Sequence, residues 1–180
     1  MAEHFRAILD VILFCAKNNL PLRGTHEKIG TSNSGIFLNL IELISHYNTN
    51  IADHIVKHKK GSVSYLSNKI QDEFVFLLGN HVRRKILSRI KKAKYFSLLF
   101  DCTPDVSHRE QMCQIIRYIR VTEYSIIIEE SFIDFIETKE KTGSGLADEI
   151  ICKLEKDGLD IQNVRGQEYD NGANMAGVYK

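Results

Sequence analysis

The sequence lacks the features that mark several protein classes. It has no tryptophan, two prolines and four cysteines among 180 residues. The cysteines are widely spaced and form no Cys-x-x-Cys pair, which argues against a zinc ribbon and against a secreted disulfide framework. The apolar stretch near the N-terminus, residues 7–16, is interrupted by Asp10 and is too short to span a bilayer. These absences favour a globular protein of a reducing compartment, without a secretion or membrane signal.

Charge is distributed unevenly along the chain, although the net charge is only +1. Residues 1–94 contain 15 Lys/Arg and 7 Asp/Glu, whereas residues 95–180 contain 9 and 16. A basic half therefore precedes an acidic half. This asymmetry fits a nucleic-acid-facing module beside a carboxylate-rich one, and two solvated surfaces of opposite sign fit it equally well.

The apolar spacing of residues 1–94 predicts several amphipathic helices. Ser34 and Thr49 are the expected N-caps of the second and third helices. Gly79-Asn80 is expected to separate a fourth helix from a fifth, which covers residues 81–93.

The fifth predicted helix is the most basic segment of the chain. Its apolar residues share one face, while seven cations and no acid follow from Arg83 to Lys94. Six of these cations are candidate contacts for DNA phosphates: Arg83, Arg84, Lys85, Arg89, Lys91 and Lys92. Such contacts would be salt-dependent and independent of DNA sequence. The alternative is a helix face that is simply solvated.

The second half of the chain alternates between strand and helix patterns. Strands are predicted over residues 95–100, 112–121, 125–136 and 161–169, with a helix before the last strand that Thr142 caps and Gly158 terminates. Asp101 follows the first strand directly, and Asp170 follows the last. The order of elements is that of the first half of a ribonuclease-H-like fold.

In such a fold the first and fourth strands are neighbours, so Asp101 and Asp170 would meet although they are 69 residues apart. Two close carboxylates repel each other unless a cation lies between them, and Mg²⁺ prefers oxygen ligands. A pair of such ions supports phosphodiester chemistry. From the residues alone, however, Asp170-Asn171-Gly172 is also a turn sequence, and the turn is the favoured interpretation.

Two motifs resemble the catalytic segments of hAT-superfamily transposases and of their domesticated relatives, the zinc-finger MYM-type-like proteins. Residues 98–111, LLFDCTPDVSHREQ, resemble the first-aspartate segment, and residues 166–177, GQEYDNGANMAG, resemble the second. In the helical half, residues 20–24 and 35–43 are similar to the domain of unknown function that precedes the catalytic core of this family. The resemblance covers nearly the whole chain.

The resemblance implies an α+β chain: residues 1–94 form a helical N-terminal domain, and residues 95–180 form an incomplete ribonuclease-H-like transposase core. It also implies that Asp101 and Asp170 are the first two ligands of an Asp-Asp-Glu triad that holds Mg²⁺ or Mn²⁺. DNA is the implied partner and the nucleus the implied location, while protein partners stay unassigned and no membrane contact is expected.

By the same resemblance, the third catalytic carboxylate and the family's C-terminal dimerisation region would follow Lys180 and are missing from this chain. Glu149 and Glu168 are the alternatives within the chain, but their spacing places neither beside both aspartates. His54 and His58 have the spacing of a zinc-binding pair on a helix. No third ligand accompanies them, so surface histidines are the favoured interpretation.

The predicted function is therefore that of a hAT-transposase-derived fragment. Its ancestral activity would be DNA binding with metal-dependent strand cleavage and transfer, and we expect weak metal binding and no strand transfer from this chain. The alternative is a domesticated, non-enzymatic DNA- or protein-binding module. A third possibility is a fragment that does not accumulate as a folded protein.

Overall fold

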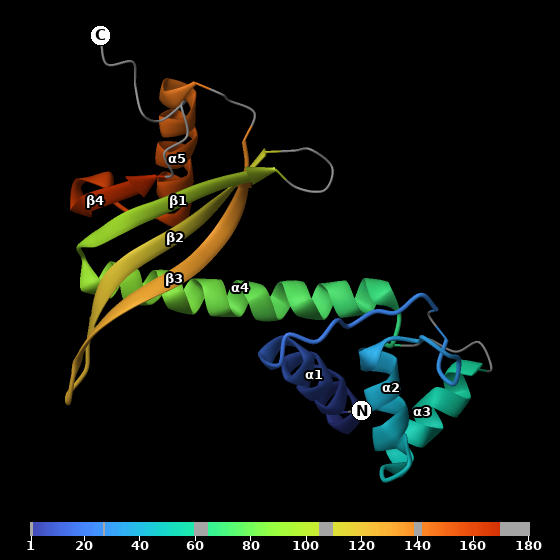
Figure 1. Cartoon of the computed structure of the whole chain (residues 1–180). Coiled ribbons are helices and arrows are strands. Elements are labelled where there is room, and N and C mark those ends of the chain that lie inside the picture. Colours follow the sequence, from blue (N-terminus) through green and yellow to red (C-terminus); the bar gives the residue numbers. More distant parts are fainter. Residues whose placement is uncertain (1, 27, 60–64, 105–109, 139–141, 170–180) are drawn as a thin grey trace. The chain divides into compact units, whose positions relative to one another are not determined.

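A computed structural model describes residues 2–26, 28–59, 65–104, 110–138 and 142–169 (Figure 1). The chain is α+β, as predicted, because helices come first and a mixed four-stranded sheet follows. It divides into two compact units, Met1–Asn80 and His81–Lys180. The change from helix to strand pattern was predicted at residue 95, and the first strand begins one residue later, whereas the division between the units falls at Asn80.

The first unit contains the helices α1 (Ala2–Lys17), α2 (Ile36–Ser45) and α3 (Thr49–Lys59) and the beginning of α4 (Asn68–Ala93). Each helix turns one apolar stripe inward, as the spacing predicted. The buried cluster of this unit consists of Ile8, Val11, Ile12, Cys15, Phe37, Leu38, Ile41, Ile51, Ile55 and Leu66. No helix within the described ranges is long and apolar enough to cross a membrane.

The predicted caps of α2 and α3 are each wrong by one residue. Gly35 is the N-cap of α2 and has a φ of 89°, which only glycine adopts without strain. The hydroxyl of Ser34 instead donates to the side-chain oxygen of Asn39. Before α3, the side chain of Asn48 accepts from the backbone N–H of Ile51, so Thr49 is already helical.

The predicted break at Gly79-Asn80 is also wrong, since α4 continues through it as one helix (Figure 1). A glycine inside a helix costs only about 1 kcal/mol relative to alanine. Packing outweighs this cost, because Leu78 lies against the core of the first unit and Leu87 is buried in the core of the second.

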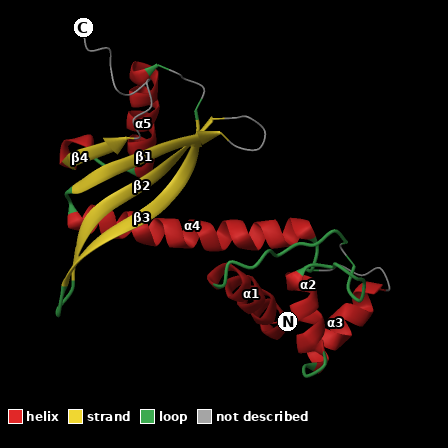
Figure 2. Cartoon of the chain, in the orientation of Figure 1, coloured by secondary structure: helices red, strands yellow, loops and turns green. Residues whose placement is uncertain are grey.

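The sheet of the second unit has the order β3-β2-β1-β4 (Figure 2). Its strands are β1 (Phe96–Pro104), β2 (Glu110–Val121), β3 (Ile126–Glu137) and β4 (Val164–Tyr169). The neighbours β1–β2 and β2–β3 are antiparallel, which confirms the predicted hairpin, whereas β1 and β4 are parallel.

The helix α5 (Gly143–Asp157) connects β3 to β4 and is followed by a short 3₁₀ turn, η1 (Ile161–Asn163). Its predicted ends are confirmed. The hydroxyl of Thr142 accepts from the backbone N–H of Gly145, and Gly158 has the left-handed conformation with a φ of 65°.

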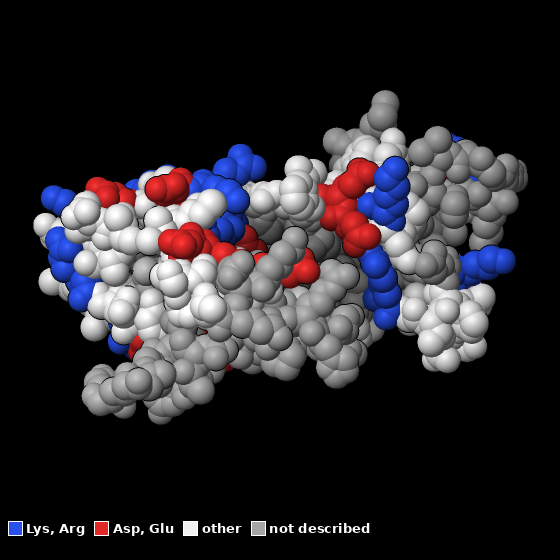
Figure 3. Space-filling model, turned by 90° about the horizontal axis from the view of Figure 1, so that it is seen from above, with Lys and Arg blue, Asp and Glu red and all other residues white. Residues whose placement is uncertain are grey.

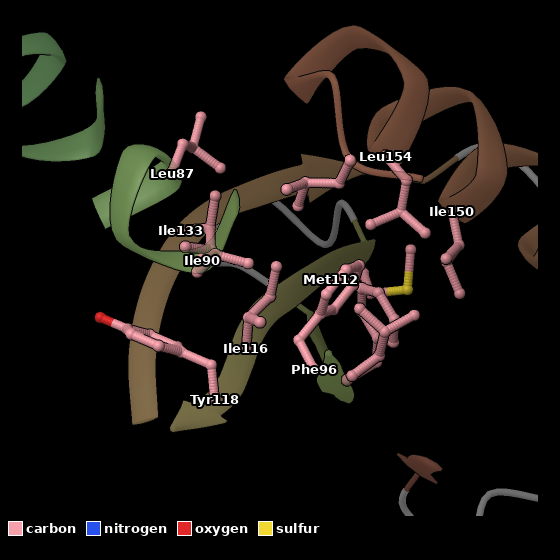
Figure 4. Packing of buried hydrophobic residues seen from close by; sticks show 12 residues of the cluster. Leu87, Ile90, Phe96, Met112, Ile116, Tyr118, Ile133, Ile150 and Leu154 are labelled. Carbon is pink, nitrogen blue, oxygen red and sulfur yellow. The ribbon is translucent and has the colours of Figure 1, made fainter. Parts of the chain in front are cut away.

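Both α4 and α5 contribute to the core on one face of the sheet (Figure 4). Leu87 and Ile90 of α4 and Ile150 and Leu154 of α5 lie in one cluster with side chains of β1, β2 and β3. The strand residues of this cluster are Phe96, Leu98, Phe100, Met112, Ile116, Tyr118 and Ile133. Because side chains alternate along a strand, their sequence neighbours point to the opposite face.

Candidate functional site

The candidate site begins at Asp101, whose carboxylate is exposed near the end of β1. The preceding residue, Phe100, is buried in the core, so alternation directs Asp101 to the opposite face of the sheet. Its partner across the antiparallel β1–β2 pair is Cys113. The pKa of the Cys113 thiol is raised by burial and, to a smaller extent, by the negative charge of Asp101.

The predicted neighbourhood of the first and fourth strands is confirmed. They pair in parallel, and Phe100 and Tyr169 are Cα partners in this register. Their rings stack with centroids 6.0 Å apart and an interplanar angle of 14°. Burial raises the pKa of the Tyr169 hydroxyl. Asp170, the second predicted ligand, follows Tyr169 in the sequence and lies outside the described residues.

The two alternative carboxylates lie on different elements. Glu168 is on β4 and pairs with Leu99, so it belongs to the same sheet face as Asp101. Glu149 is on α5, which packs on the other face. Within the described ranges, no group of three or more His, Cys, Asp or Glu residues is arranged to hold a metal ion. Oxygen donors such as Asp101 and Glu168 are nevertheless of the type that Mg²⁺ and Mn²⁺ accept.

Of the predicted pair His54 and His58, the structure describes only the side chain of His54. The ring of His54 stacks on Tyr65, with centroids 5.7 Å apart and an interplanar angle of 18°. This half-buried position gives the side chain a packing role in the first unit. The side chain of His58 lies outside the described residues.

The cationic face of α4 has partners that its own sequence did not reveal. Arg83 forms an ion pair with Asp157 of α5, whose side chain is only 2% exposed, and also approaches Asp134 of β3 at 3.7 Å. The Nη1 atom of Arg89 lies 3.9 Å from the Oε2 atom of Glu129 on β3. Two of the six candidate DNA contacts are therefore engaged by acids of the same unit, and Figure 3 shows basic and acidic side chains next to each other on the surface.

These acids come from segments about 40 to 75 residues later in the chain. No short-range pattern connects them to α4, and the only hint in the sequence was the excess of acids in the second half. Some cations of the basic half of the chain thus form ion pairs with acids of the acidic half, within the second unit.

A mixed sheet with α4 and α5 packed on one face, and with the carboxylate of Asp101 on the opposite face of β1, defines an RNase-like α+β domain. The comparison with known families agrees, since residues 1–180 match the DUF4371 family, described as the ZMYM1/FAM200 RNase-like domain. The match covers the whole chain, and the chain belongs to this family.

A similar curated protein is the human "52 kDa repressor of the inhibitor of the protein kinase". The two sequences are 20% identical over 172 residues, which is 93% of this chain and 22% of the relative. The chain thus spans about one fifth of the length of that relative. The predicted likeness to zinc-finger MYM-type proteins is confirmed at the level of the ZMYM1/FAM200 domain.

Proposed function

We propose that the chain is part of a hAT-transposase-derived protein that binds DNA in the nucleus. Its RNase-like sheet would hold Mg²⁺ or Mn²⁺ between Asp101 and Asp170, and its ancestral chemistry is metal-dependent strand cleavage. The repressor named above supports a nuclear role by similarity. We expect no strand transfer from this chain.

One observation carries the metal proposal: Phe100 and Tyr169 are Cα partners in the parallel β1–β4 pair. Each immediately precedes one of the two aspartates in the sequence. The sheet register therefore supports a carboxylate pair at this edge. If a divalent ion binds there, it supplies charge neutralisation and activates a water, while the two carboxylates fix its position.

Titration of Mn²⁺ into the purified chain tests this proposal, with calorimetry as the readout. We expect weak binding that Asp101→Asn or Asp170→Asn reduces at least about tenfold, since even changes outside the ligand set lower metal affinity about 10- to 100-fold. Asp148→Asn, an exposed carboxylate on α5, is the control and should bind as the wild type does. Equal binding by all four proteins would contradict the metal pair.

The second candidate function is a non-enzymatic DNA- or protein-binding module. The ion pairs of Arg83 and Arg89 show that these two cations serve the fold itself, so a DNA-binding module would use the other cations of α4. The module is supported if both aspartate variants leave every activity unchanged while Lys/Arg→Glu changes in α4 abolish DNA binding. Cleavage of DNA that depends on Asp101 would exclude it.

A further inference from the structure

A groove lies between the second half of α4 and the end of α5. It is lined by Arg83, Arg84, Leu87, Ser88, Lys91, Lys156 and Asp157. Three of these residues belong to the six candidate DNA contacts of α4. The other three candidates, Lys85, Arg89 and Lys92, do not line it, whereas Lys156 joins it from α5. The groove is thus lined by three of the six candidate cations of α4 and by one further cation, Lys156, from α5.

The groove keeps a positive charge after its internal ion pair is taken into account. Its single carboxylate, Asp157, is almost fully buried and bonded to Arg83. Among the described residues, neither Lys91 nor Lys156 forms an ion pair. The charges of Lys91 and Lys156 are therefore not neutralised within the lining. A cleft lined by charge of one sign raises the local concentration of the opposite ion.

The donors of the groove come together in space. Arg84, Ser88 and Lys91 follow the i, i+4, i+7 spacing of one helix face. The ammonium of Lys91 reaches the end of α5, since a Cβ added at Gly158 would lie 2.8 Å from it. Lys156 lies in the last turn of α5, next to that end. Two elements thus bring a guanidinium, two ammonium groups and a hydroxyl to one groove.

This donor set indicates the chemistry of the ligand. Apart from the paired Asp157, every polar lining group can donate hydrogen bonds, and Leu87 is the only apolar side chain. Cationic donors form their strongest hydrogen bonds with carboxylate and phosphate oxygens. We propose that this α4–α5 groove binds a phosphate group.

The phosphate could belong to a DNA backbone or to a small free phosphate. In the first case the groove deepens the DNA binding proposed above, on which that arm rests; it does not depend on Asp101 or Asp170. Two probes distinguish the sources: a labelled DNA duplex at low salt, and inorganic phosphate followed by NMR chemical shifts of the full chain.

The variants compare lysines that line the groove with lysines that do not. Lys156→Gln and Lys91→Gln each remove a groove donor. The controls, Lys69→Gln on α4 and Lys57→Gln on α3, remove exposed lysines that neither line the groove nor belong to the six candidate DNA contacts. We expect each groove variant to weaken duplex binding about tenfold, the loss of one charge-assisted hydrogen bond, and to lower the salt slope by about one. The two control variants should change affinity less than about twofold, and circular dichroism confirms that all four fold.

The outcomes separate this inference from the proposed function. If Lys156→Gln abolishes the shifts with inorganic phosphate but no protein binds the duplex, the groove is a site for small phosphates and the DNA proposal fails. If groove and control variants weaken duplex binding equally, the overall charge of the chain attracts the DNA and the groove proposal is overturned. Absence of binding by the wild type to both probes also overturns it.

Discussion

Arg83 shows how a residue that its sequence neighbours assign to a solvated face can contact a buried acid. Its neighbours in the chain are cations, which suggested a solvated or DNA-binding face. Its guanidinium instead pairs with Asp157, whose side chain is 2% exposed. The buried carboxylate depends mainly on this partner, because its other cation, Lys153, lies 4.0 Å away.

We therefore expect Arg83→Ala to lower the free energy of unfolding by about 2 kcal/mol, less than for a fully buried pair, because Lys153 stays near Asp157. Arg6→Ala is the control, because the Arg6–Asp10 pair is separated by 3.9 Å and both side chains are largely exposed. That change should lower the free energy of unfolding by less than about 1 kcal/mol. Urea denaturation followed by circular dichroism measures both, and similar losses in the two variants would show that the Arg83 pair is not structural.

Tyr95 carries a second residue-scale prediction. Its pKa is lowered from 10.0, first by a hydrogen bond from Arg165 and then by the charge of Lys94. A lowered pKa means that the folded state favours the phenolate. The resulting stabilisation is present above the unfolded pKa and is lost as the pH falls through the folded pKa. Alkaline titration of phenolate absorbance, taken as wild type minus Tyr95→Phe, should show a midpoint below 10.0. Arg165→Gln should raise this midpoint, and no change would remove Arg165 as the cause.

At the scale of elements, two glycines differ in their surroundings: the backbone at Gly35 has no room for a side chain, whereas the backbone at Gly79 has room. An added Cβ on Gly35 would lie 2.4 Å from the backbone nitrogen of Gly24, and the φ of Gly35 is 89°. Gly24 and Gly35 belong to the segments that resemble the family's helical domain. Gly79, inside α4, has nothing within 4 Å of an added Cβ.

These two environments predict opposite effects of the same substitution. Gly35→Ala should lower the free energy of unfolding by at least about 2 kcal/mol, since its backbone conformation is nearly exclusive to glycine. Gly79→Ala should raise it by about 0.5–1 kcal/mol, because alanine loses less conformational freedom in a helix. Denaturant titrations of the two variants test this. A destabilised Gly79→Ala protein would argue that α4 needs its glycine as a joint.

Other element-scale predictions succeeded or failed according to the range of the forces involved. The cap at Thr142, the end at Gly158 and the hairpin between β2 and β3 were predicted because neighbouring residues determine them. The continuity of α4 was not, since burial of Leu87 and its companions on the sheet overrides a local glycine signal. The N-cap of α2 differs by one residue because Gly35 adopts a positive φ there, and that of α3 because the Asn48 side chain accepts from the helix in place of Thr49.

At the scale of the whole molecule, the sheet exposes a broad apolar face. Opposite the helices, β2 and β3 present the exposed side chains Ile119, Val121, Ile126, Ile128, Phe132 and Phe135. An ion pair between Arg117 and Glu130 lies among them. Contiguous apolar surface of this kind promotes association.

Removal of part of this face should reduce self-association. Ile126 and Ile128 are 75% and 70% exposed, so replacing both by threonine keeps the strand propensity and costs less than about 1 kcal/mol in stability. Sedimentation velocity at rising concentration should show fewer oligomers than for the wild type. Val56→Thr, an exposed apolar residue of α3, is the control and should leave association unchanged. Equal sedimentation of all three proteins would show that the face does not drive association.

The sequence by itself determined the type and approximate limits of most helices and strands and the α+β class. Local propensities, hydrophobic periodicity and motifs sufficed for these features, because each depends on residues close together in the chain. The predicted end of the first strand before Asp101 was wrong, because pairing with β2 continues β1 to Pro104. Only the tertiary structure decided which charges neutralise each other and which donors share the α4–α5 groove. These properties depend on contacts between Arg83 and Asp157 and between Lys91 and the end of α5. These residues are more than 60 positions apart in the chain, so no local pattern encodes the contacts.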